Sequence, residues 1–145
     1  MSLIQWQDSY SVGVPMLDSD HKILISLLNQ LYDAREEGQS QEVIGSVLNV
    51  LVEYTINHFA REERLMEIGG YPHLEEHRKE HRRLTNTVRE YHLEYINGRH
   101  TAVSDVFELL KDWLIKHILI ADSRYQPYVE NVDVTSEEVF ENLAR

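Results

Sequence analysis

The chain has 145 residues, with 14 Lys and Arg, 25 Asp and Glu and no cysteine, and its formal net charge is −11. This length fits a single domain with its own hydrophobic core. The absence of cysteine excludes disulfides, thiolate metal sites and iron–sulfur clusters, so any metal must be held by nitrogen and oxygen. The negative charge argues against nucleic-acid binding, which depends on cationic side chains that neutralise phosphates.

The amino terminus lacks the basic start and the apolar run of a signal peptide. No stretch approaches the roughly 20 apolar residues that cross a bilayer. We therefore expect a cytoplasmic protein that makes no membrane contact.

In chain order, residues 1–18 are expected to form an ordered arm, with Asp18 or Ser19 as the cap of the first helix. Apolar residues then recur in alternating steps of three and four, which is typical of amphipathic helices. Four such helices are expected, at about residues 19–37, 41–68, 72–97 and 102–121. Short glycine-containing connections favour antiparallel neighbours, so the predicted fold is all-α, an up-down-up-down four-helix bundle.

We interpret residues 1–145 as one domain, in which residues 19–125 form the bundle and residues 126–145 are a C-terminal extension. Thr135 or Ser136, followed by two glutamates, could begin a short extra helix there. The extension could equally be a partner surface or a frayed tail, and the residues alone do not decide between these.

Polar side chains occupy seven positions on or beside the apolar faces of the predicted helices. They are His21, His58, Glu62, His77, His81, His117 and Asp122. A single histidine on such a face is most often an ordinary core residue. Five histidines on four helices are not explained in this way, because each unpartnered buried imidazole or carboxylate costs several kcal/mol. Cations can satisfy all seven groups at once, so the pattern predicts a metal centre.

The spacing of these residues supports one shared site. Residues four apart lie about 6 Å from each other on one helical face, so His58 with Glu62, and His77 with His81, can reach one cavity. His117 and Asp122 are five apart, about 140° around a regular helix. That pair requires a local widening such as a π-type turn, a distortion common at functional sites.

Seven ligands are too many for one tetrahedral zinc ion. Two ions bridged by two carboxylates fit better, and imidazole with carboxylate suits iron among the redox metals. The ferritin-like di-iron proteins use a different pattern of Glu-x-x-His pairs with mostly carboxylate ligands. Because nitrogen outnumbers carboxylate here, we expect the site to favour binding dioxygen over splitting it.

With these seven residues and their flanks, the sequence resembles the hemerythrin family, and within it the bacteriohemerythrins, over about residues 4–130. The flanks match as well as the ligands: Val12-Gly13-Val14 precedes the first histidine, and Asp112-Trp113-Leu114 precedes His117. The resemblance implies that His77, His81 and His117 bind one iron, and that His21 and His58 bind the other. It implies further that Glu62 and Asp122 bridge the two ions together with an oxide or hydroxide.

The resemblance also implies an apolar oxygen pocket. The corresponding residues here are Leu24, Phe59, Trp113, Leu114 and Ile118. Read from the residues alone, these side chains are ordinary core packing, and the two interpretations are compatible.

The leading hypothesis is a non-enzymatic, di-iron dioxygen-binding protein for storage, delivery or scavenging of oxygen, with no protein partner identified. The first alternative is an oxygen or redox sensor that acts through a partner. The second is a di-iron peroxidase or oxidase, or an iron-handling protein, although no added acid or base is visible near the ligand motifs.

Overall fold

The computed structural model describes residues 4–117 and 122–129, apart from the side chains of Asp122 and Ser123. A short 3₁₀ helix in the arm precedes five α-helices in this part of the chain. In order they are η1 (Asp8–Tyr10), α1 (Pro15–Glu36), α2 (Gln41–Gly69), α3 (Leu74–Ile96), α4 (Ala102–Lys116) and α5 (Asp122–Val129). The possible extra helix at Thr135 or Ser136 lies outside the described residues.

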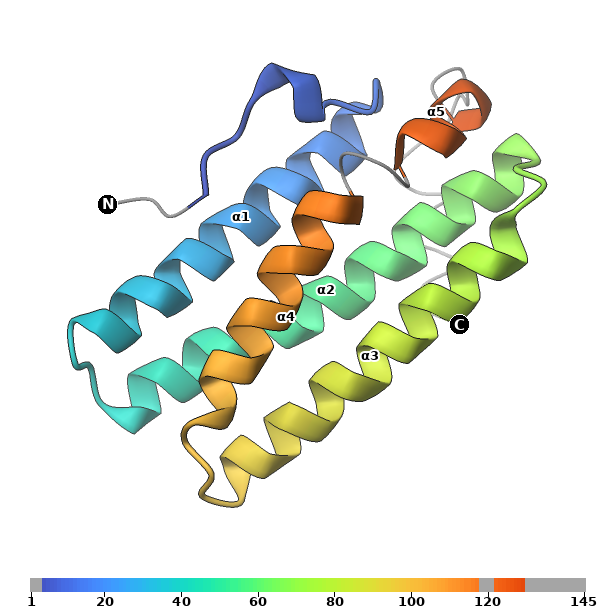
Figure 1. Cartoon of the computed structure of the whole chain (residues 1–145). Helices are drawn as coiled ribbons and strands as arrows, with labels where there is room; N and C mark the ends of the chain where they lie inside the picture. The colour runs from blue at the N-terminus through green and yellow to red at the C-terminus, as the bar shows by residue number, and fades with distance from the viewer. Residues whose placement is uncertain (1–3, 118–121, 130–145) are drawn as a thin grey trace.

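The four long helices form the predicted antiparallel bundle (Figure 1). Each consecutive pair from α1 to α4 packs together, and α4 also packs against α1, which closes the ring. The short helix α5 folds back against α2. The all-α bundle predicted from the apolar periodicity is therefore confirmed.

The first helix begins earlier than predicted. α1 starts at Pro15, with Val14 as its extended N-cap, so neither Asp18 nor Ser19 is the cap. Proline suits the first helical position because its fixed φ is already helical and it lacks an N–H that would need a partner. The Asp18 carboxylate instead accepts hydrogen bonds from the Val12 N–H at 2.9 Å and from the Ser11 hydroxyl at 2.6 Å, which ties the arm to the helix.

The other helix limits follow local chemistry. The Ser40 hydroxyl caps α2 by accepting from the Val43 N–H at 3.3 Å. The helix ends at Gly69, and its C-cap is Gly70, whose φ of 72° is readily adopted only without a side chain. The resulting length of α2, 29 residues, lets one helix carry core residues at one end and both His58 and Glu62 toward the other.

Two clusters of buried apolar side chains fill the bundle. The larger includes Leu24, Leu48 and Phe59, and the smaller includes Leu17 and Leu65. On α1, His21 lies between Leu17 and Leu24, and on α2, Glu62 lies between Phe59 and Leu65. A polar layer therefore separates the two apolar clusters.

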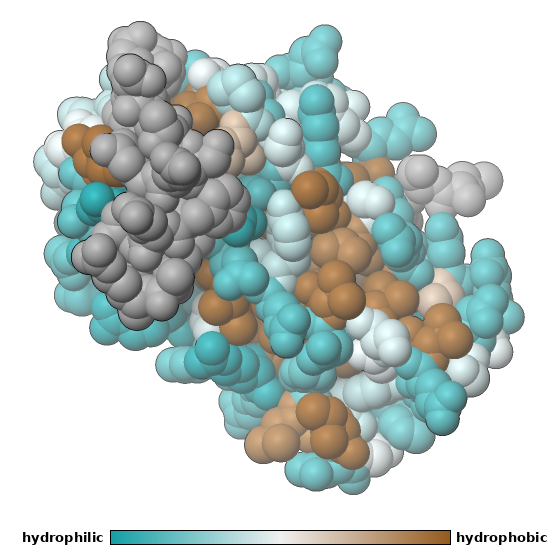
Figure 2. All heavy atoms as spheres, turned by 180° about the vertical axis from the view of Figure 1, so that it is seen from behind, coloured by the Kyte–Doolittle hydropathy of each residue, from teal (hydrophilic) through white to brown (hydrophobic). Residues whose placement is uncertain are grey.

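The surface in Figure 2 is largely hydrophilic, with apolar side chains gathered in a band on this face. Seven large apolar side chains among the described residues are exposed. They are Ile23, Val43, Val50, Ile68, Leu93, Ile96 and Tyr128. Within the described ranges, no helix is long and apolar enough to span a membrane.

The core position of Leu48 gives a direct test of the packing. Leu48 is completely buried, so Leu48→Ala should lower the free energy of unfolding by about 2–5 kcal/mol through lost burial and a residual cavity. Val50 on the same helix is 48% exposed, and Val50→Ala should change it by less than about 0.5 kcal/mol. Urea denaturation of both variants checks this, and equal losses would contradict the placement of α2.

Candidate metal centre

Five imidazoles converge on one buried carboxylate, that of Glu62. The distances from its oxygens to the Nε2 atoms are 2.9 Å for His117, 3.1 Å for His58, 3.2 Å for His77, 3.3 Å for His81 and 3.9 Å for His21. Glu62 is 0% exposed, and none of the five histidines exceeds 6%. The polar layer between the two apolar clusters is thus a single group of side chains in the interior of the bundle.

Each of the four long helices, or its end, contributes to the cluster. His21 comes from α1, while α2 provides His58 and Glu62 one turn apart. His77 and His81 stand one turn apart near the start of α3, and His117 follows the last residue of α4. Sequence neighbours four apart share a helical face, so two pairs of ligand-type side chains are already positioned by local structure.

The environment of Glu62 keeps it ionised. Burial alone would raise the pKa of this carboxyl, but the charge and hydrogen bond of His117, together with hydrogen bonds from His21 and His58, hold the pKa well below its usual value. A buried carboxylate with no positive charge beside it would cost several kcal/mol. The anion is therefore stable only as part of this histidine cluster or with cations inside it.

Two overlapping groups of side chains could each hold a metal ion. One is His21, His58, Glu62 and His117; the other is Glu62, His77, His81 and His117. Within each group the ligand atoms lie within 4.8 Å of one another. Glu62 and His117 belong to both groups, so a pair of ions held here could share the Glu62 carboxylate, and the nitrogen and oxygen donors fit iron.

The end of α4 shows the distortion that the His117–Asp122 spacing predicts. His117 adopts a π-helical conformation, and α5 starts at Asp122. Residues 118–121 between them lie outside the described residues, as does the Asp122 side chain. The widened turn at His117 agrees with the prediction, and the position of the Asp122 carboxylate remains a prediction.

A buried ion pair between Asp20 and Arg61 contacts the outer nitrogen of His58, the one that faces away from Glu62. Asp20 accepts from His58 Nδ1 at 3.0 Å and from the Arg61 guanidinium at 2.8 and 3.0 Å. The Tyr54 hydroxyl donates to the same carboxylate at 2.7 Å. Although burial raises the pKa of Asp20, the hydrogen bonds from His58 and Arg61 outweigh it and lower the pKa to about 2. The network leaves Nε2 of His58 facing Glu62.

A similar but more exposed pair supports His81. Its Nδ1 lies 3.1 Å from a Glu63 oxygen, and Glu63 in turn pairs with Arg78 at 3.4 Å. Carboxylates that accept from the outer nitrogen of a histidine fix the ring orientation and direct the other nitrogen inward. Phe59 stacks on the His81 ring with centroids 3.9 Å apart.

A small apolar cavity lies in the core beside the cluster, with a volume of about 10 Å³. It is lined by Leu24, Leu28, Leu51, Thr55, Leu110, Trp113 and Leu114. The Thr55 hydroxyl donates to the Leu51 carbonyl at 2.7 Å, so its proton is already used. This volume is at the lower limit for one water-sized molecule.

These features can be compared with known proteins. A family model described as the hemerythrin HHE cation binding domain matches residues 12–129. The chain belongs to the hemerythrin family. It is 35% identical to a bacteriohemerythrin of Stenotrophomonas maltophilia, over 90% of this chain and 84% of that protein. It is 30% identical to a bacteriohemerythrin of Methylococcus capsulatus, over 88% of this chain and 97% of that protein.

Solved hemerythrin structures give the same result. Wild-type hemerythrin superposes with a TM-score of 0.82 at 28% identity, covering 88% of this chain and 98% of that one. A hemerythrin with a leucine replaced by tyrosine gives 0.83 at 27% identity, covering 90% and 99%. Both the fold and the family expected from the sequence are confirmed.

The structure brings together six of the seven predicted ligand residues, all except Asp122, whose side chain is not described. Of the predicted oxygen-pocket residues, three line the apolar cavity: Leu24, Trp113 and Leu114. Phe59 instead packs edge-on against Trp113 and stacks on His81, and Ile118 lies outside the described residues.

Sequence reasoning missed the Asp20–Arg61 pair. Arg61 follows His58 by three residues, and His58 follows Tyr54 by four, so the spacing that identified the apolar face of α2 also includes Arg61. A charged residue on that face was the available signal for a buried partner. Its partner on α1, immediately before His21, could be identified only from the packing of the two helices.

Removal of Arg61 should be costly because it leaves Asp20 buried without its main counter-charge. Arg61→Met is expected to lower the free energy of unfolding by about 3 kcal/mol or more. Arg64, also on α2, pairs with Glu67 at the surface, so Arg64→Met should cost less than about 1 kcal/mol. Urea denaturation at neutral pH tests both, and similar losses would show that the Asp20 pair is not important for stability.

Proposed function

We propose that this protein binds two iron ions and through them binds dioxygen reversibly, as an oxygen storage, delivery or scavenging protein. The observation that carries the proposal is the single buried carboxylate with five imidazole Nε2 atoms within 3.9 Å of it. Membership of the hemerythrin family supports it, as do the relatives named bacteriohemerythrin.

The proposed ligand set uses all seven predicted residues. His77, His81 and His117 hold one ion, and His21 and His58 hold the other. Glu62 and Asp122 would supply carboxylate ligands to both ions, and an oxide or hydroxide would complete the centre. His117 is a member of both ligand groups in the structure. Its assignment to the first ion rests on the family resemblance.

Bound iron would supply the electrons that dioxygen accepts and returns. The protein contributes the surroundings. Asp20 and Glu63 orient two of the imidazoles through their outer nitrogens, and the apolar cavity keeps bulk water from the site. The proposed oxygen pocket is this cavity with its Leu24, Trp113 and Leu114 walls, extended by Phe59 and Ile118.

The cavity also supports a binding role rather than an enzymatic one. Among the described residues, its lining contains no carboxyl, imidazole or amine group that could deliver protons during turnover. Protons delivered to reduced dioxygen favour its release as a product, whereas an aprotic wall favours its return unchanged. This lining supports reversible binding over peroxidase or oxidase chemistry.

The test is iron content per chain together with optical spectra through reduction, exposure to air and deoxygenation. We expect two irons and an absorption band that appears in air and disappears under vacuum. Glu62→Ala should hold fewer than two irons, because the shared carboxylate is gone, whereas His92→Ala on α3 should keep both. Two irons that oxidise irreversibly would exclude an oxygen carrier, and full iron content in Glu62→Ala would exclude the ligand assignment.

Leu114 provides a separate test of the cavity. It is 1% exposed and lines the apolar space, so Leu114→Ala should admit water and shorten the lifetime of the oxygen-loaded protein several-fold while leaving iron content at two. Leu109→Ala, also on α4 but outside the cavity lining, is the control. Optical decay in air-saturated buffer measures both, and an unchanged lifetime in Leu114→Ala would contradict a protective role.

A further inference from the structure

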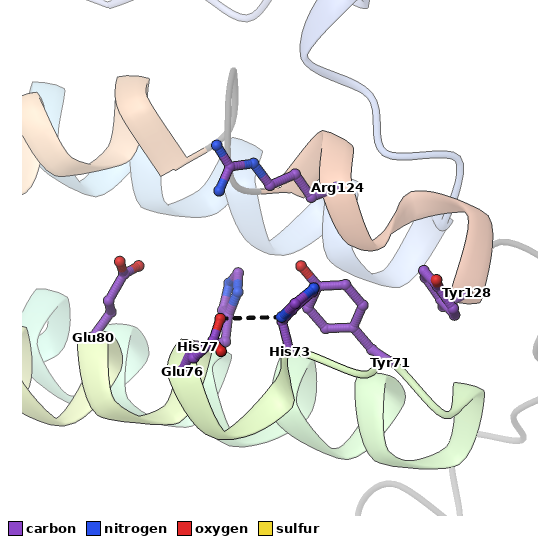
Figure 3. A pocket seen from close by; sticks show the side chains of 7 residues that line it. All are labelled: Tyr71, His73, Glu76, His77, Glu80, Arg124 and Tyr128. Carbon is purple, nitrogen blue, oxygen red and sulfur yellow. Dashed lines mark ion pairs between the residues drawn. The ribbon is translucent and has the colours of Figure 1, made fainter.

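A second, very different pocket reaches the histidine cluster from solvent. It has a volume of about 460 Å³ and lies between the start of α3 and α5 (Figure 3). His73, Glu76, His77 and Glu80 line it from one side, Arg124 and Tyr128 of α5 from the other, and Tyr71 from the connection before α3. None of these residues except His77 belongs to the proposed metal centre.

His77 connects this pocket to the centre. Its Nε2 faces Glu62 at 3.2 Å, while the ring also lines the pocket. At 6% it is the most exposed of the five clustered histidines. The outer nitrogens of His58 and His81 are held by carboxylates, but among the described residues nothing accepts from His77 Nδ1. Figure 3 shows its ring between Glu80 and His73, directed toward α5.

The charges around the pocket favour a cation. Two carboxylates, Glu76 and Glu80, face one guanidinium, that of Arg124. Glu76 pairs with His73 at 3.1 Å. Neither Glu80 nor Arg124 forms an ion pair within the described part of the chain. Carboxylate oxygens beside an imidazole are donors that Fe²⁺ accepts.

The other approaches to the cluster are unsuitable for a cation. A groove of about 280 Å³ touches His81, but three arginines (Arg78, Arg82 and Arg89) line it against one carboxylate, Glu63. The apolar cavity beside Leu114 offers no charged group to a hydrated ion. A metal ion loses its water gradually only where protein donors replace it, and among these three spaces only the pocket at His77 is lined by more carboxylates than guanidinium groups.

We propose that the pocket at His77 is the entry route for Fe²⁺, an inference that rests on the proposed iron-binding function. Glu80 attracts the hydrated ion and binds it transiently, with Glu76 at the outer rim. His77 receives it and passes it to the Glu62 cluster. Arg124 opposes this step, because its positive charge lies over the same space.

The two charges predict opposite effects on the rate of iron uptake. Apo-protein is prepared from the full-length chain with a chelator, its helicity is checked by circular dichroism, and Fe²⁺ is added without oxygen. Glu80→Gln should slow the initial uptake by roughly tenfold, since a charged cleft raises local cation concentration and on-rate. Arg124→Gln should accelerate it, and every variant should still reach two irons per chain.

Glu90→Gln is the matched control, because it removes the same charge from an exposed position of α3 outside the pocket. It should load at the wild-type rate, and high salt should reduce the difference between wild type and Glu80→Gln. The entry route is refuted if Glu80→Gln loads as fast as Glu90→Gln, or if Arg124→Gln loads more slowly than wild type. Wild-type protein that takes up no iron would instead refute the proposed function.

Discussion

Burial of one carboxylate among five imidazoles dictates how the four long helices are arranged. Glu62 is fully enclosed and its oxygens contact Nε2 atoms from every long helix of the bundle or its end. Such a cluster is costly in an apolar interior unless opposite charges or cations compensate it. The helices are thereby cross-linked through a polar layer, and a metal that binds there would stabilise the folded state because the unfolded chain has no preformed site.

The two apolar clusters on either side of this layer provide the rigidity that a metal centre requires. Leucine-rich packing fixes the spacing of the helices, and the polar residues then need only short-range orientation. Asp20 with Arg61, and Glu63 with Arg78, supply it for His58 and His81. The first pair is deeply buried and the second half-exposed, so the two halves of the centre differ in how firmly their histidines are held.

Three spaces of different chemistry surround the centre. The cavity at Leu114 is small and apolar. The groove at His81 is rich in arginine, and the pocket at His77 is lined by carboxylates together with the buried His77 ring. The proposed binding of iron and dioxygen would need separate approaches for ion and gas, because a hydrated cation and a neutral molecule require opposite surroundings.

The bundle and most of the histidine cluster could be predicted from the order of the amino acids, because both depend on helical periodicity. Leucines and histidines that share one face must point the same way, and the five-residue step from His117 to Asp122 required the widened turn found at His117. Which elements pack against each other could be learned only from the folded protein. Asp20 and Arg61 are 41 residues apart, and the pocket at His77 exists because α5 folds back against α2 and faces the start of α3. Neither the ion pair nor the pocket leaves a pattern in the local sequence, since both depend on how separate helices pack in space.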